Sequence, residues 1–125
     1  MQLAFFVGVG GFLGAILRYF MSGWVQDILG KPYWPYGTLA VNVLGCLLLG
    51  FLVGLVEVRN VFSPEVRSLL FIGVLGGFTT FSTFGVETST LLRDGALTSA
   101  AANIFLQVVL GVGAAMMGYY LSHLT

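Results

Sequence analysis

The chain has 125 residues, about one domain in length, of which 58% are hydrophobic and 8% are charged. A soluble domain carries roughly 25% charged residues, so this chain has too few polar side chains to cover a water-facing surface. The composition excludes a disordered chain and a nucleic-acid-binding domain, and it indicates that lipid surrounds most of the protein. The net charge of zero attracts no charged macromolecule. The single cysteine, Cys46, forms no disulfide within the chain and no cysteine-based metal cluster.

Four long apolar segments predict four membrane-spanning helices in a single transmembrane domain, residues 1–125. We place the spans at about residues 3–25, 36–56, 67–92 and 96–122. Each is long enough to cross the hydrocarbon core, which takes about 20 helical residues. A transmembrane barrel would show alternating polarity, so the prediction is an all-α membrane protein. The first span lacks a basic n-region and is longer than a typical signal peptide core, so we expect it to be retained.

The connections carry helix-breaking and capping residues. Two prolines within Gly30–Pro35 separate the first span from the second. The second connection, Glu57–Arg67, contains Ser63-Pro64-Glu65, which predicts an N-cap followed by a helix start. Arg93-Asp94-Gly95 predicts the last turn. Aromatic residues typical of a membrane interface gather at the first connection and are Trp24, Tyr33, Trp34 and Tyr36.

Positive charge is spread almost evenly over the two sides of the predicted bundle. Arg59 and Arg67 lie on the side of the termini, whereas Lys31 and Arg93 lie on the other side, with Arg18 inside the first span toward that end. The positive-inside rule therefore favours neither orientation. Either a feature outside this rule determines one orientation, or the chain inserts both ways and pairs antiparallel. Because four spans hardly enclose an ion pathway alone, we expect an oligomer.

Small residues recur at four-residue spacing, which lets helix backbones approach closely. The pairs are Gly10 and Gly14, Gly50 and Gly54, Gly73 and Gly77, and Ala114 and Gly118. With 18 glycines in the chain, some such pairs arise by chance. As a group they predict tight helix contacts.

Polar side chains within the first two spans are expected to have a structural or functional role, since they are costly in lipid. Arg18 lies near the loop end of the first span, where its guanidinium either reaches the interface or lines the mouth of an anion pathway. Asn42 follows Thr38 by one turn on the same face of the second span. The Asn42 amide either forms an interhelical hydrogen bond or donates to a passing anion.

The fourth span carries a polar stripe at four-residue spacing. Its members are Ser99, Asn103, Gln107 and Gly111. Two amides are poor lipid-facing residues, so this stripe is expected to face protein or water. It either bonds a neighbouring helix or lines an ion pathway.

The third span contains the densest polar pattern, from Gly73 to Gly85. Gly76 and Gly77 lie near mid-membrane and are followed by hydroxyl residues interleaved with phenylalanines. Glycine destabilises a helix by about 1 kcal/mol relative to alanine, so we predict a break near mid-membrane. The freed backbone groups then need protein, water or an ion as partners.

Phenylalanines recur at every third position of this span, at Phe78, Phe81 and Phe84. An aromatic stripe most often packs in a core, but ring edges carry partial positive charge and can face an anion. Glu87 follows Thr83 by one turn near the end of the span, where it either joins a polar lining or simply reaches the interface.

The sequence contains no recognisable catalytic set. The single histidine, His123, lies near the end of the chain, without a nucleophile or a second ligand beside it. No phosphate-binding loop, redox pair or carboxylate dyad is present. We predict that the chain is not an enzyme.

Three segments, Gly14–Arg18, Gly37–Asn42 and Gly76–Phe84, resemble those of the bacterial fluoride channel family (CrcB/Fluc) in content and order. The resemblance covers the whole chain, and the GGxTTFSTF pattern of the third segment is highly specific. It implies a passive, fluoride-selective channel that exports fluoride from the cytoplasm and lowers its intracellular level. It also implies an antiparallel, dual-topology homodimer with two pores, in the bacterial inner membrane.

Together, the resemblance and the polar patterns predict the residues of the ion pathway. They are Arg18, Thr38, Asn42, Phe81, Ser82, Thr83, Phe84, Glu87, Asn103 and Gln107. The resemblance places Asn42 in the pore and turns the ring edges of Phe81 and Phe84 toward the ion. At the two fourth-span positions the family carries Tyr and Ser, where this chain has Asn103 and Gln107.

The resemblance also implies a structural sodium ion that is not transported. Backbone carbonyls of Gly76 and Thr79 from both subunits would hold it on the two-fold axis. Carbonyl oxygens are hard ligands suited to such a cation.

Two other classes of protein share some of these features. A small dual-topology multidrug or proton-coupled transporter also has four helices, but it needs a membrane-embedded carboxylate, for which Glu87 is the one candidate. A structural subunit of a larger assembly would use its polar stripes to join helices. A channel predicts fast passive flux, a transporter predicts slow pH-coupled exchange, and a structural subunit predicts no flux.

Overall fold

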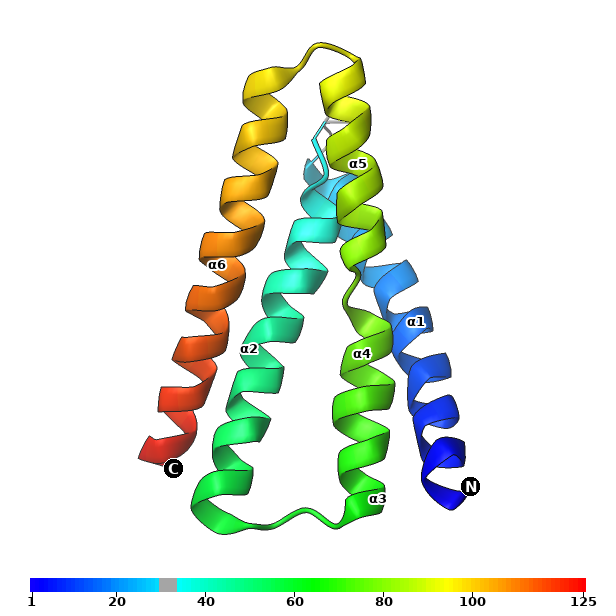
Figure 1. Cartoon of the computed structure of the whole chain (residues 1–125), viewed down its shortest axis with the longest axis vertical. Coiled ribbons are helices and arrows are strands. Elements are labelled where there is room, and N and C mark those ends of the chain that lie inside the picture. The colour runs from blue at the N-terminus through cyan, green and yellow to red at the C-terminus, as the bar shows by residue number, and fades with distance from the viewer. Residues whose placement is uncertain (30–33) are drawn as a thin grey trace.

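Every described segment of regular structure is helical (Figure 1). The computed structural model describes residues 1–29 and 34–125. The elements are α1 (Gln2–Leu29), α2 (Tyr36–Arg59), α3 (Pro64–Arg67), the π-helix η1 (Ser68–Leu75), α4 (Gly76–Phe78), α5 (Phe81–Arg93) and α6 (Leu97–Leu124). Most of the first predicted connection, with Lys31 and Tyr33, lies outside the described residues.

Four helical segments are long and apolar enough to cross a membrane: α1, α2, the composite segment Pro64–Arg93, and α6. The predicted spans lie within these segments, except that Ala96 precedes α6. Both termini lie at the same end of the bundle, beside the connection between α2 and α3 (Figure 1). The prediction of an all-helical chain with four possible membrane spans is confirmed.

The third span is interrupted at Thr79 and Thr80. Both backbones are extended, with φ −86° and ψ 158° at Thr79 and φ −151° and ψ 116° at Thr80. The break lies within the segment where it was predicted, Gly73–Gly85, just after Gly76 and Gly77, which remain helical in α4. Thr80 gives the physical reason: its hydroxyl accepts from the Thr83 N–H at 3.2 Å and so caps a new helix, α5. Capping, rather than glycine flexibility, determines where the helix breaks.

Glycines let α1 lie directly against the first half of the third span. A side chain on Gly10 would collide with the Leu69 carbonyl, and one on Gly14 with the Val74 carbonyl. On the opposite side, a side chain on Gly77 would meet the Gly11 carbonyl at 2.8 Å. The third span is here a π-helix, which the sequence pattern did not predict; π-helical turns often occur at functional sites.

A second glycine seam joins α2 to α6. A side chain on Gly50 would collide with the Ala115 carbonyl, and one on Gly118 with the Leu47 carbonyl. The predicted small-residue pairs therefore lie at helix contacts within one chain.

The second connection is shorter than the predicted Glu57–Arg67, because helices extend into it from both sides. α2 continues to Arg59, and Asn60 ends it in the left-handed region at φ 48°. Ser63 accepts from the Val66 N–H at 3.3 Å, as its predicted role as N-cap requires. At the last turn Gly95 has φ 76°, which glycine adopts without strain.

We expect Gly14→Ala to lower the free energy of unfolding by about 1–3 kcal/mol, because the added methyl group forces α1 away from the third span. Gly8→Ala is the matched control, since nothing lies within 4 Å of a Cβ at that position. Thermal unfolding in detergent, followed by loss of the monodisperse size-exclusion peak, measures the difference. Equal midpoints for the two variants would contradict the close-packed seam.

Candidate functional site

Asn42 of α2 bonds to the break in the third span. Its Oδ1 accepts from the Thr80 N–H at 2.8 Å, and its Nδ2 donates to the Thr80 carbonyl at 3.1 Å. In an uninterrupted helix the Thr80 N–H would donate to the Gly76 carbonyl, so Asn42 replaces the acceptor that this group has lost. The Thr80 carbonyl belongs to the N-cap of α5, and it accepts from Asn42 in addition. Asn42 therefore makes the interhelical hydrogen bonds that one of its two predicted roles required.

The same amide joins the break to α6. Asn42 Nδ2 also donates to Oε1 of Gln107 at 3.0 Å, so α2, the third span and α6 meet in one hydrogen-bonded group. The nitrogen end of the Gln107 amide, unlike its oxygen end, is not hydrogen-bonded in this group. Its Nε2 is buried and has no hydrogen-bond partner among the described residues.

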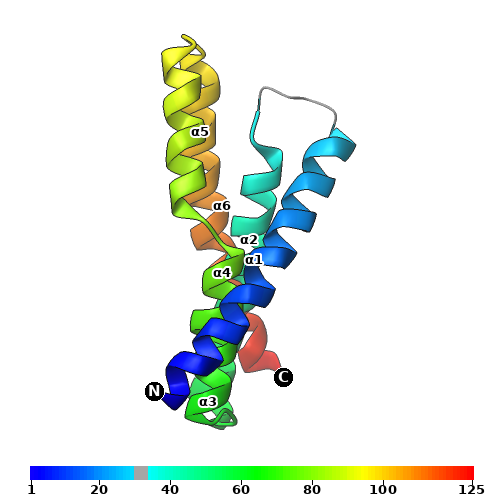
Figure 2. The ribbon, with the colours of Figure 1, turned by 90° about the vertical axis from the view of Figure 1, so that its right-hand side faces the viewer.

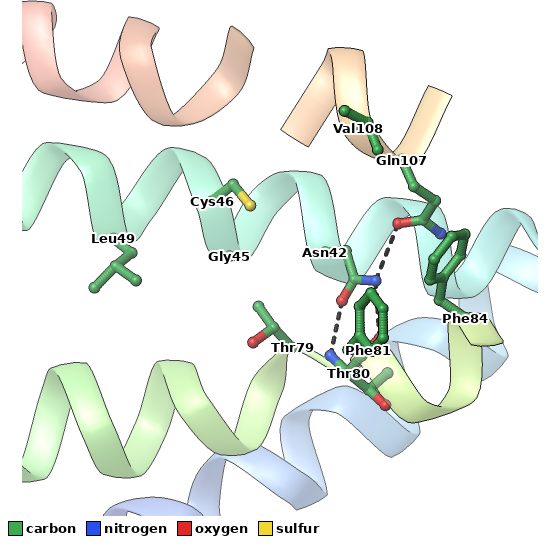
Figure 3. A pocket seen from close by; sticks show the side chains of 10 residues that line it. All are labelled: Asn42, Gly45, Cys46, Leu49, Thr79, Thr80, Phe81, Phe84, Gln107 and Val108. Carbon is green, nitrogen blue, oxygen red and sulfur yellow. Dashed lines mark hydrogen bonds between the residues drawn. The ribbon is translucent and has the colours of Figure 1, made fainter. Parts of the chain in front are cut away.

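A cavity of about 280 Å³ lies at this junction (Figure 3). Its lining residues are Asn42, Gly45, Cys46, Leu49, Thr79, Thr80, Phe81, Phe84, Gln107 and Val108. The Phe81 and Phe84 rings lie with centroids 5.5 Å apart and planes inclined by 59°. Phe81 is 82% exposed in the single chain, so this side of the cavity lies on the outer surface. We call this space the central cavity.

Arg18 lies on the other side of the break. Its Nη1 donates to the Thr79 carbonyl at 3.3 Å, so the guanidinium is turned toward the interrupted backbone. It lines a cavity of about 370 Å³ together with Thr38, Thr80 and Thr83. The arrangement places the positive charge of the Arg18 guanidinium directly beside the interrupted backbone at Thr79.

α5 and the start of α6 diverge from α1 and α2 (Figure 2). Residues of these four helices line a larger cavity, of about 1100 Å³. We call it the vestibule. Thr38 and Glu87 both line it, and the Thr38 hydroxyl donates to Glu87 Oε1 at 2.7 Å. Glu87 Oε2 is buried and has no partner among the described residues.

The hydroxyl residues that follow the break in the third span divide into two groups. Thr80 is buried, and its hydroxyl donates to Thr83 Oγ1 at 2.9 Å. Ser82 and Thr83 are exposed in the single chain, with Ser82 Oγ 3.4 Å from Thr80 Oγ1. Both of these hydroxyl residues therefore lie on the outer surface of the single chain, beside the break.

The two amides of α6 lie in different surroundings. Asn103 is fully buried, and its Nδ2 donates to the Thr88 hydroxyl at 2.9 Å, which holds α5 against α6. It lines neither the central cavity nor the vestibule. The structure thus brings Gln107, but not Asn103, together with Asn42 and the two phenylalanines.

The two carbonyls expected to hold a cation, those of Gly76 and Thr79, are among those that the break releases. The Thr80 N–H, which would donate to the Gly76 carbonyl in a continuous helix, donates to Asn42 instead. The Thr83 N–H, which would donate to the Thr79 carbonyl, donates to the Thr80 hydroxyl. Gly76 is exposed on the outer surface of the chain. Two freed hard oxygens fit a sodium ion, although Arg18 already shares the Thr79 oxygen.

Three residues important for this geometry were not among the predicted site residues: Gln26, Thr80 and Thr88. The spacing of Thr80 and Thr83 before a helix is a capping signal that could have identified Thr80. Gln26 accepts from the Gly37 N–H at 3.1 Å and donates to the Trp34 carbonyl at 2.9 Å, which ties α1 to the start of α2. No sequence signal points to Gln26 or Thr88, because their partners come from other helices.

These features define the protein as a multi-pass α-helical membrane protein with polar groups gathered around a break in one span. Residues 5–119 match the family described as CrcB-like protein, Camphor Resistance (CrcB). The chain belongs to this family.

Relatives within the family are closely similar in sequence. The chain is 49% identical over 115 residues to the "Fluoride-specific ion channel FluC" of Sulfurovum sp. (strain NBC37-1), covering 92% of this chain and 89% of the relative. It is 47% identical over 109 residues to the protein of that name from Geotalea daltonii, covering 87% of each. It is 45% identical over 112 residues to "Fluoride-specific ion channel FluC 1" of Methanosarcina acetivorans, covering 90% of this chain and 84% of the relative. These names describe ion channels, a class of protein without enzymatic activity.

We expect Asn42→Leu to lower the free energy of unfolding by about 1–3 kcal/mol, because it leaves the buried Thr80 N–H without an acceptor. Unfolding by SDS in mixed micelles, followed by circular dichroism, measures the loss. Thr90→Val is the control, since among the described residues the exposed Thr90 hydroxyl bonds only within its own helix. It donates to the Val86 carbonyl at 3.0 Å and accepts from Arg93 Nη2 at 3.2 Å. A loss no larger than that of the control would show that Asn42 does not stabilise the break.

Proposed function

We propose that this protein is a fluoride-specific ion channel that passively exports fluoride from the cytoplasm and so lowers its intracellular level. One observation carries the proposal: the central cavity brings amide groups and phenyl rings together at a helix break, in a chain whose relatives are named fluoride-specific ion channels. The proposed location is the bacterial inner membrane.

The lining of the central cavity suits a small anion. No carboxylate is among its lining residues, and the polar residues of the lining are Asn42, Cys46, Thr79, Thr80 and Gln107. α5 begins at Phe81, so the partial positive charge of its N-terminus lies at the cavity. Ring edges of Phe81 and Phe84 add weak positive potential without binding the ion tightly. Conduction needs such moderate attraction, which admits an ion and still releases it.

The working unit in this proposal is an antiparallel, dual-topology homodimer with two pores. Phe81, Ser82 and Thr83 are exposed on the single chain at the helix break. A second copy would cover these hydroxyls and complete the open side of the cavity. The even distribution of positive charge supports insertion in both orientations, which antiparallel pairing requires.

A structural sodium ion is part of the proposal. The freed carbonyls of Gly76 and Thr79 from both subunits would hold it, and its charge would tie the two breaks together. Arg18 would share the Thr79 oxygen with it, since a carbonyl has two lone pairs.

We expect purified protein in liposomes loaded with potassium fluoride to release fluoride rapidly when valinomycin carries the balancing potassium. A fluoride electrode measures the release, and liposomes loaded with potassium chloride and read with a chloride electrode should release far less. Phe81→Ile should slow fluoride release about tenfold or more, because it removes the ring edge from the cavity. Slow exchange driven by a pH gradient would favour a proton-coupled transporter. No release from folded wild-type protein would overturn the channel.

We also expect both orientations of the chain in one membrane. A cysteine added after Thr125, in a variant with Cys46→Ser, should react with an impermeant maleimide from outside in about half of the molecules. Reaction of the remainder should follow only after the membrane is permeabilised. Labelling of all molecules, or of none, before permeabilisation would exclude the antiparallel dimer.

A further inference from the structure

Arg67 ends α3, at the end of the bundle that carries both termini (Figure 1). The third span turns apolar just after it, from Leu69 to Ile72, and Ile72 is 63% exposed. Phe62 of the preceding connection packs edge-to-face against Phe71, with ring centroids 6.0 Å apart. Arg67 therefore lies at the boundary between a polar connection and an apolar span, the depth at which a bilayer places its headgroups.

Asn60 holds the Arg67 guanidinium on one side. Its Oδ1 accepts from Arg67 Nη2 at 3.2 Å. A guanidinium has donors only, so the end of the amide that faces it must be Oδ1. Asn60 is itself fixed, because it ends α2 in the left-handed conformation and its N–H donates to the Val56 carbonyl at 2.9 Å. Because this amide is neutral, the contact orients the guanidinium without balancing its charge.

The rest of the guanidinium lacks partners. Arg67 Nε is buried, and no acceptor reaches it from residues 1–29 or 34–125. No carboxylate in this part of the chain forms an ion pair with Arg67 either, although Glu65 lies two residues earlier. A buried N–H group without an acceptor is costly, and a partly buried charge without a counter-charge adds to that cost. The side chain therefore favours an anionic acceptor from outside the chain.

The chain has three other arginines, and each donates a hydrogen bond to an oxygen of the chain. None of these three has a buried, unpartnered nitrogen in the described structure. Arg93 is the closest match, since it also ends a helix, at the opposite end of the bundle (Figure 1). Its Nη2 donates to the Thr90 hydroxyl at 3.2 Å. The buried, unpartnered N–H group distinguishes Arg67 from all three.

We propose that Arg67 binds the phosphate group of a membrane phospholipid, with Nε donating to a phosphate oxygen and Asn60 holding the guanidinium in place. Phosphate is the anion that phospholipids present at this depth, and its oxygens match the adjacent N–H groups of a planar guanidinium. The exposed Ile72 side chain lies farther along the same span, where acyl chains would contact it. The site is separate from the central cavity, so this inference does not depend on the proposed function.

Thermal unfolding in dodecyl maltoside tests the site, since this detergent contains no phosphate. Dioctanoylphosphatidylglycerol should raise the unfolding midpoint of the wild-type protein. Arg67→Gln should need about tenfold more lipid for the same shift, because it removes the charged donor. Arg93→Gln is the matched control and should respond as the wild-type protein does. Equal lipid responses of these two variants would overturn the inference.

Two further ligands separate the phospholipid from its parts. Dioctanoylglycerol has the same acyl chains without the phosphate, and inorganic phosphate has the oxygens without the chains. Neither should match the stabilisation by the phospholipid at equal concentration. Equal stabilisation by dioctanoylglycerol would exclude a phosphate contact. Equal stabilisation by inorganic phosphate would assign the site to a free ion and overturn the lipid.

A second measurement uses the wild-type protein and so does not depend on how well the variants fold. ¹⁵N-arginine labelling gives four Nε signals, one for each arginine, and Arg67→Lys identifies one of them. In dodecyl maltoside micelles the phospholipid should shift the Arg67 signal, and dioctanoylglycerol should not. Shifts at the other arginines with none at Arg67 would overturn the assignment. So would dissociation of Arg67→Gln into single chains without a lipid-induced shift in the wild-type protein, since Arg67 would then bind a second copy.

Discussion

An interrupted helix inside a bilayer must find new partners for the backbone groups that the interruption frees, because lipid offers none. In this protein the break lies at Thr79 and Thr80, and Asn42 accepts from the freed N–H of Thr80 while it also donates to the Thr80 carbonyl. The rest of the site depends on this contact. It brings α2 to the third span, orients the Asn42 amide, and through Gln107 adds α6 to the same group.

Close backbone contact makes such a small junction possible. Gly10 and Gly14 let α1 lie against the π-helical half of the third span, and Gly50 and Gly118 let α2 lie against α6. Two tightly packed helix pairs thus flank a loosely packed region around α5, where the cavities lie. The two closely packed helix pairs hold the polar groups at fixed positions, while the space around α5 stays unfilled.

The electrostatic character of the site comes from fixed groups rather than from titratable side chains. Arg18 supplies a positive charge on one side of the break, and the start of α5 supplies partial positive charge on the other. The carboxylate of Glu87 lies farther along, in the vestibule, where Thr38 donates to it. Attraction therefore comes from preorganised donors, which suits passage of an anion better than tight binding does.

The sequence by itself determined that the protein is helical and spans a membrane, since its apolar segments have the length and composition that a bilayer requires. It also determined the family, because the GGxTTFSTF pattern is specific, and it indicated most of the residues that meet around the break. The tertiary structure decided the exact position of the break, at Thr79 and Thr80 just after the two glycines, where the Thr80 hydroxyl caps the next helix. It alone separated Gln107 from Asn103. Both amides look alike in sequence, and only the packing of α6 against α2 and α5 decides that Gln107 meets Asn42 whereas Asn103 meets Thr88.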